Sequence, residues 1–126
     1  MQIYLLTVLY LFITGLFLLI DNYRELLAFL IRYRHLLLSS VKARVCAGAL
    51  GIILSLLNLF LPSYPGPMYL GDLIPAVALF LSAFYYFTLK EERIGDATLY
   101  AKGKTRGTLL LLSAVFHFIL PTCVLL

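Results

Sequence analysis

Four long apolar stretches dominate this sequence and leave little freedom in how the chain can fold. They cover residues 3–20, 45–61, 73–89 and 108–126. At 1.5 Å per residue, helices of this length extend roughly 26 to 29 Å, which matches the hydrocarbon core of a bilayer. We therefore predict an all-α integral membrane protein, in which residues 1–126 form a single domain built on a bundle of four transmembrane helices.

The composition leads to the same expectation. Hydrophobic residues make up 63% of the 126 residues and charged residues 13%, against roughly 45–50% and 25% in soluble domains. A short chain has a high ratio of surface to volume, so a soluble fold would leave much of this apolar surface in water. The composition thus argues against a water-soluble globular protein.

The positions of the basic residues predict how the bundle is oriented. All ten Lys and Arg residues fall in the segments 21–44 and 90–107, between apolar stretches. Basic loops remain on the cytoplasmic side, so we expect both segments there and both termini on the extracytoplasmic side of a plasma membrane, the inner membrane in bacteria. The net charge of +4 then favours membrane lipids with anionic headgroups as partners, and no nucleic acid.

The leucine-rich segment 24–38 has the appearance of a fifth span, but its centre carries Arg32, Arg34 and His35. Each arginine at mid-membrane costs about 2.5 to 3.5 kcal/mol, and a fifth span would move the segment 90–107 to the opposite side. We predict instead an amphipathic helix lying in the cytoplasmic interface. Five basic residues in and after it are expected to contact anionic lipid or a partner: Arg24, Arg32, Arg34, Lys42 and Arg44.

The segment 90–107 is predicted to be mostly a loop. It is mixed in charge, and Gly95, Gly103 and Gly107 are expected to interrupt any helix there. A short helical extension followed by a flexible basic turn is the interpretation that this pattern favours.

Three polar residues are candidates for a substrate or ligand path. His117 is an ionisable residue near the middle of the fourth stretch, and such groups inside a membrane often serve a function. Asn58 and Asp72 lie near the outer ends of the second and third stretches, where they are able to form an outward-facing polar site. The alternatives are structural: a neutral His117 bonded to a neighbouring helix, and Asp72 as a helix N-cap.

A group of small residues predicts a helix-packing interface in the second stretch. Ala47, Gly48 and Gly51 allow another helix backbone to approach closely, which is the main way that helices associate in lipid. The approaching helix belongs either to the same bundle or to another subunit, and the sequence leaves both open.

No motif for catalysis, a metal or a cofactor is found in the sequence. Gly103-Lys104-Thr105 has the ending of a phosphate-binding loop, but position 98, where the motif requires glycine, is threonine. Cys46 and Cys123 have no metal-ligand spacing, and no carboxylate is expected beside Ser113 and His117 to complete a catalytic triad. We expect a protein that is not an enzyme and that holds no metal or cofactor.

These patterns favour a protein that acts by contact. The leading hypothesis is a small accessory or scaffold subunit of an inner-membrane protein complex, which works through helix–helix and lipid contacts and has another membrane protein or a second copy as its partner. The alternative is a small oligomeric transporter or channel, with a polar path that includes His117, Asn58 and Asp72. Since no Asp or Glu lies inside the four stretches, a proton-coupled antiporter is disfavoured.

Overall fold

A computed structural model describes residues 2–20, 22–23, 25–60, 73–89 and 97–119. In these ranges the chain is helical, which confirms the predicted all-α class. The elements are α1 (Gln2–Leu19), the short 3-10 helix η1 (Ala28–Leu30), α2 (Ile31–Ser39), α3 (Val41–Phe60), α4 (Leu73–Thr88) and α5 (Ala97–Ile119).

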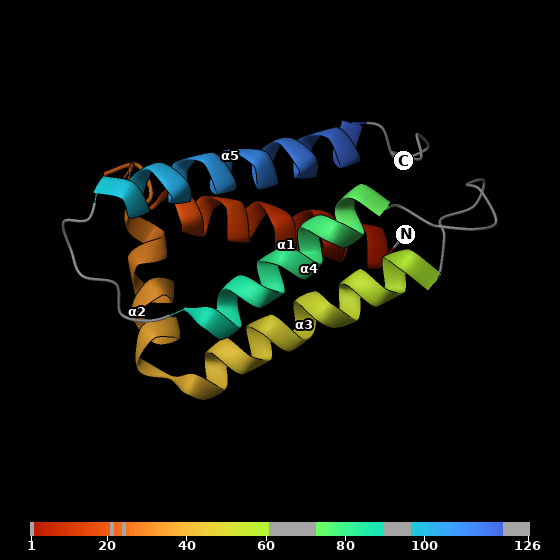
Figure 1. The fold of residues 1–126 in the computed structure, drawn as a ribbon, viewed down its shortest axis with the longest axis horizontal. Coiled ribbons are helices and arrows are strands. Elements are labelled where there is room, and N and C mark those ends of the chain that lie inside the picture. The colour runs from red at the N-terminus through yellow and green to blue at the C-terminus, as the bar shows by residue number, and fades with distance from the viewer. Residues whose placement is uncertain (1, 21, 24, 61–72, 90–96, 120–126) are drawn as a thin grey trace.

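The four long helices lie roughly side by side, and α2 crosses one end of them (Figure 1). We call this end the α2 end. Helices α1 and α4 finish there, whereas α3 and α5 begin there. Two antiparallel pairs make the most extensive contacts, α1 with α5 and α3 with α4, and α1 also contacts α3 and α4. Helix α1 therefore joins the two pairs, and α4 also contacts α5.

Glycines allow α1 and α5 to approach each other closely. A Cβ atom added at Gly107 would lie 2.9 Å from the Gly15 carbonyl oxygen, and one added at Gly103 would lie 3.2 Å from the Leu18 carbonyl oxygen. The prediction that Gly103 and Gly107 interrupt the helix is wrong, because both lie inside α5. Helical glycine costs about 1 kcal/mol, and the close packing against α1 offsets that cost.

The first half of α5 and the start of α2 also differ from the predicted boundaries. Helix α5 begins at Ala97 rather than at residue 108. The helix predicted over 24–38 begins only at Ile31, after η1, and Arg24 lies outside the described residues. Leu27 and Leu30 are buried together with Leu19 and Ile20, so burial of these leucines fixes the turns before α2.

Judged by length and composition, α3 is the one helix among the described residues that is long and apolar enough to cross a membrane. The apolar helices Ile3–Leu19 and Leu73–Thr88 are shorter.

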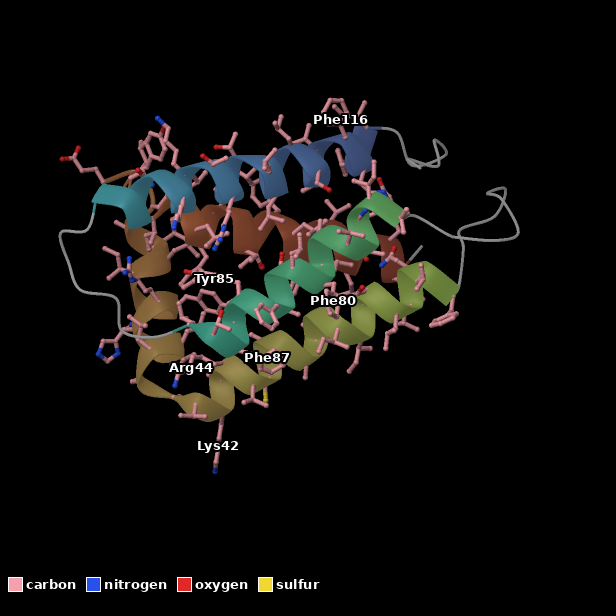
Figure 2. The ribbon with its side chains drawn as sticks, viewed as in Figure 1. Lys42, Arg44, Phe80, Tyr85, Phe87 and Phe116 are labelled. Atoms are coloured by element: carbon pink, nitrogen blue, oxygen red, sulfur yellow. The ribbon has the colours of Figure 1, made fainter. Side chains whose placement is uncertain are left out.

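The bundle has polar groups inside and apolar groups outside. Its buried polar side chains are Thr7, Thr14, Ser55, Asn58, Ser82 and His117. Large hydrophobic side chains are exposed on all four long helices, and Phe116, for example, projects from α5 away from the other helices (Figure 2). The interior also holds many buried apolar side chains, such as those of Leu11 and Leu79, so the unusual feature is the number of large apolar side chains on the outside.

We predict that replacing Gly107 with leucine destabilises the fold by about 1 to 3 kcal/mol, the usual cost of overpacking. The new side chain would collide with the backbone of Gly15 and with Leu19. Thermal unfolding in mild detergent, followed by size-exclusion chromatography, measures the effect. The matched control is Thr108→Leu at the exposed neighbouring position, which should unfold close to the wild-type temperature; equal loss in both variants would contradict the close-packing argument.

Candidate functional site

One face of α1 contacts both α3 and α4 of the other helix pair. Thr7, Tyr10, Thr14 and Phe17 are three or four residues apart, so they lie on the same side of the helix. Each of them contacts α3 or α4. We call this row of residues and their partners the polar seam.

The bond between Thr7 and Asn58 is one of two buried side-chain hydrogen bonds in the polar seam. The Asn58 Nδ2 atom donates to Thr7 Oγ1 at 2.7 Å and to the Leu54 carbonyl oxygen of its own helix at 2.7 Å. Both side chains are buried, and a buried amide without such bonds costs about 1 to 3 kcal/mol. The side chain of Asn58 therefore fixes α3 against α1.

Further hydrogen bonds follow along α1 towards the α2 end. The Tyr10 hydroxyl donates to the Ala47 carbonyl oxygen at 3.0 Å. The Thr14 and Tyr86 hydroxyls lie 3.1 Å apart, and the ring of Phe17 stacks on that of Tyr86 with centroids 5.9 Å apart. The polar seam thus connects α1 first to α3 and then to α4.

His117 lies at the opposite end from α2, in the last turn of α5. Its side chain is 2% exposed, and its ring centroid lies 4.7 Å from that of Tyr4. The Tyr4 hydroxyl donates to the His117 carbonyl oxygen at 2.6 Å. Their partners on α1, Tyr4 for His117 and Thr7 for Asn58, are separated by about 4.5 Å along the helix axis. His117 and Asn58 therefore contact α1 at nearly the same level.

The third residue of the predicted path, Asp72, lies outside the described residues. Helix α4 begins at the next residue, Leu73. The predicted position of Asp72 in an outward-facing polar site therefore stays a prediction. Asn58, the other residue of that site, points into the bundle towards Thr7.

The small residues of α3 are covered by the chain's own helices. A Cβ atom added at Gly48 would lie 2.7 Å from Phe87 Cζ, and one added at Gly51 would meet the Tyr10 hydroxyl and Ala83. Both glycines are buried, and the half-buried Ala47 accepts the bond from Tyr10. The sequence left open whether these small residues pack against a helix of the same bundle or of another subunit. In the structure they pack against helices of the same bundle.

The predicted basic residues have different surroundings. The guanidinium of Arg44 donates to the Leu89 carbonyl oxygen at 2.6 Å, just beyond the C-terminus of α4, where a cation also complements the helix dipole. Arg34 is half-buried, while Arg32 and Lys42 are exposed. In Figure 2 the side chain of Lys42 extends away from the helices.

Sequence reasoning missed Tyr4, Thr7, Thr14 and Tyr86 as parts of the buried polar system. A signal was present, since Thr7 and Thr14 are seven residues apart in an otherwise apolar segment. That spacing places both hydroxyls on one helix face, two turns apart. Their partners on α3 and α4 depend on long-range packing, which the spacing does not reveal.

A comparison with known protein families finds a match over residues 1–117, to a family of unknown function. No curated protein and no solved structure shows a significant match.

We predict that Thr7→Ala and Asn58→Ala are coupled in stability. A double-mutant cycle should give a coupling energy of about 0.5 to 1.5 kcal/mol, the usual net contribution of one intramolecular hydrogen bond. Unfolding of the four proteins in mild detergent supplies the values. As a control, Thr88→Ala removes an exposed hydroxyl that bonds only within α4, and its effect should add to that of Asn58→Ala without coupling.

Proposed function

The chain belongs to this family of unknown function, and we propose that it is a small membrane protein with four spans that serves as an accessory or scaffold subunit of a membrane protein complex. The observation that carries this proposal is the large number of apolar side chains exposed on the outside of the bundle, together with hydrogen-bonded polar side chains buried in its mainly apolar interior. In lipid, polar side chains turn towards the bundle interior and apolar ones face the acyl chains.

The lengths of the helices are compatible with this location. Helix α4 has 16 residues and α1 has 18, which is at or just below the usual range of about 17 to 25 residues for a span. A bilayer adapts to a short span by local thinning or by snorkelling of flanking residues, at a modest cost per ångström.

The charge distribution supports one orientation. All the basic residues in the described ranges lie at or near the α2 end: Arg32, Arg34, Lys42, Arg44, Lys102, Lys104 and Arg106. We propose that this end is cytoplasmic, following the positive-inside rule. Helix α1 begins and α5 finishes at the other end, so the termini are proposed to be extracytoplasmic.

The contacts of the polar seam favour an accessory role. The side chains of Asn58, Thr14 and Ser55 form hydrogen bonds inside the bundle, so these groups hold helices together. The surfaces that remain for interaction are the apolar outer faces and the α2 end. A protein with this distribution of groups is suited to contacts with other membrane proteins and with lipid.

We expect a stoichiometric partner to accompany the tagged protein from its native membrane. The measurement is native mass spectrometry of the protein purified in native nanodiscs, with an unrelated four-span protein of similar length as the control. A partner seen with this protein and not with the control supports the accessory role. A purely monomeric protein without partners would contradict it.

The second candidate function is that of a small oligomeric transporter or channel. It is favoured by His117, whose buried side chain lies against Tyr4, close to the Thr7–Asn58 bond. In that case His117→Ala should abolish flux into proteoliposomes, while Phe116→Ala at an exposed position of the same helix should leave it near the wild-type rate. Unchanged flux in His117→Ala would remove His117 from the path.

The proposed orientation predicts one-sided labelling. In a background with Cys46→Ser and Cys123→Ser, a cysteine at the exposed position 35 of α2 should react with a membrane-impermeant maleimide only after the cytoplasmic side is opened. A cysteine placed before Met1 should react from outside in intact cells. The reverse pattern would overturn the orientation.

A further inference from the structure

We propose that the outward face of η1 and α2, together with exposed cations of α3 and α5, binds anionic phospholipids of the cytoplasmic leaflet. We call this region the α2 surface; it consists of Leu26, Phe29, Leu36, Arg32, Lys42, Lys102, Lys104 and Arg106. The inference rests on the proposed membrane location and names the lipid class that this end of the protein selects.

The segment around α2 has two apolar faces, and only one of them is used inside the protein. Leu30 and Leu37 are buried against the bundle. Tyr33 packs on the ring of Phe17 with centroids 5.8 Å apart. These contacts hold α2 across the end of the bundle, where it is visible in Figure 1.

The other face exposes large apolar side chains. Leu26 is 78% exposed, Phe29 68% and Leu36 53%. Arg32, also exposed, lies between Phe29 and Leu36 in the sequence. Exposed apolar groups beside a cation are the pattern of a helix that lies in the membrane interface, with the apolar side chains at the acyl boundary and the cation among the headgroups.

The cations of α5 lie at the same end of the protein. The backbone of Gly103 lies against the Leu18 carbonyl, so Lys102 and Lys104 are level with the last turn of α1. About two turns further along α5, Leu111 packs against the cluster that contains Leu27 and Leu30. Lys102, Lys104 and Arg106 are exposed, and they therefore border the region where η1 leads into α2.

The structure separates the cations that are available to a ligand from those that serve the fold. Arg44 bonds the Leu89 carbonyl oxygen, and Arg34 is half-buried and has an interaction of its own. Five exposed cations remain: Arg32, Lys42, Lys102, Lys104 and Arg106. Within the described ranges these five exposed cations stand against one acidic residue, Glu25, so the described part of the α2 surface is positive and complements a negatively charged leaflet.

A lipid fits this surface better than a nucleic acid or an acidic protein does. Cations near an anionic leaflet contribute an affinity of about five-fold each, and the exposed leucines and phenylalanine add contact with the acyl chains. A nucleic acid would contact the cations alone and leave the apolar side chains in water.

The test uses the full-length protein in nanodiscs of phosphatidylglycerol and phosphatidylcholine in equal amounts, with the retained lipids identified by native mass spectrometry. We expect phosphatidylglycerol to be enriched several-fold among the retained lipids. The variant with Lys42→Gln, Lys102→Gln, Lys104→Gln and Arg106→Gln should lose this preference. The control with Lys42→Arg, Lys102→Arg and Lys104→Arg keeps the charge and should keep the preference.

A second variant tests the apolar half of the α2 surface. Leu26→Ser, Phe29→Ser and Leu36→Ser leave the charge unchanged, so they should reduce the number of retained lipids of both kinds and preserve the preference for phosphatidylglycerol. All three side chains are exposed, and the variant should elute as a folded protein. Lipid retention equal to wild type in this variant would overturn the role of the apolar face.

Equal retention of both lipids by the wild-type protein, or enrichment that survives the four glutamine substitutions, would overturn the proposal. A protein partner that needs the same cations, without lipid enrichment, would also overturn it and leave the accessory role intact. Lipid enrichment without any partner protein would support the α2 surface and remove the accessory role.

Discussion

The hydrogen bond from Asn58 to Thr7 is the interaction on which the arrangement of the bundle depends. It lies where α1 meets α3, and both side chains are buried. Dispersion contacts between apolar side chains alone leave the register of α1 against α3 and α4 weakly specified. The buried amide of Asn58 specifies it, because a shift of either helix would break the hydrogen bond to Thr7.

The opposite face of α1 is organised by a different constraint. Gly15 and Gly107 remove side chains where α1 and α5 meet, and the backbones approach until Leu111 lies against Gly15. Helix α1 is thus held on one side by directional hydrogen bonds and on the other by close packing, which are the two means by which helices associate in lipid. Its position between α5 and the α3–α4 pair follows from this division.

Much of this architecture was predictable from the sequence, because apolar runs and glycine positions are local signals. The four long helices and the presence of a helix near α2 follow from hydrophobic length, whereas Asn58 was expected in an outward-facing polar site and is instead buried against Thr7. The helical start of α5 was not predictable, since Gly103 and Gly107 are unfavourable in an isolated helix and only the contact with Leu18 and Leu19 explains them. Likewise, the covering of Gly48 by Phe87 depends on how α4 packs, which no local pattern specifies.

Because two faces of α1 are packed against other helices, its threonine side chains are not available on the surface of the protein. The third face of α1 exposes apolar side chains such as Leu5 and Leu9, and the hydroxyls on its buried face form bonds with α3 and α4. Within the described residues, exposed cations are concentrated at the α2 end. Tyr33 links that end to the polar seam, because its ring meets Phe17, which stacks on Tyr86 beside Thr14. The α2 surface therefore rests directly on contacts that hold the two helix pairs together.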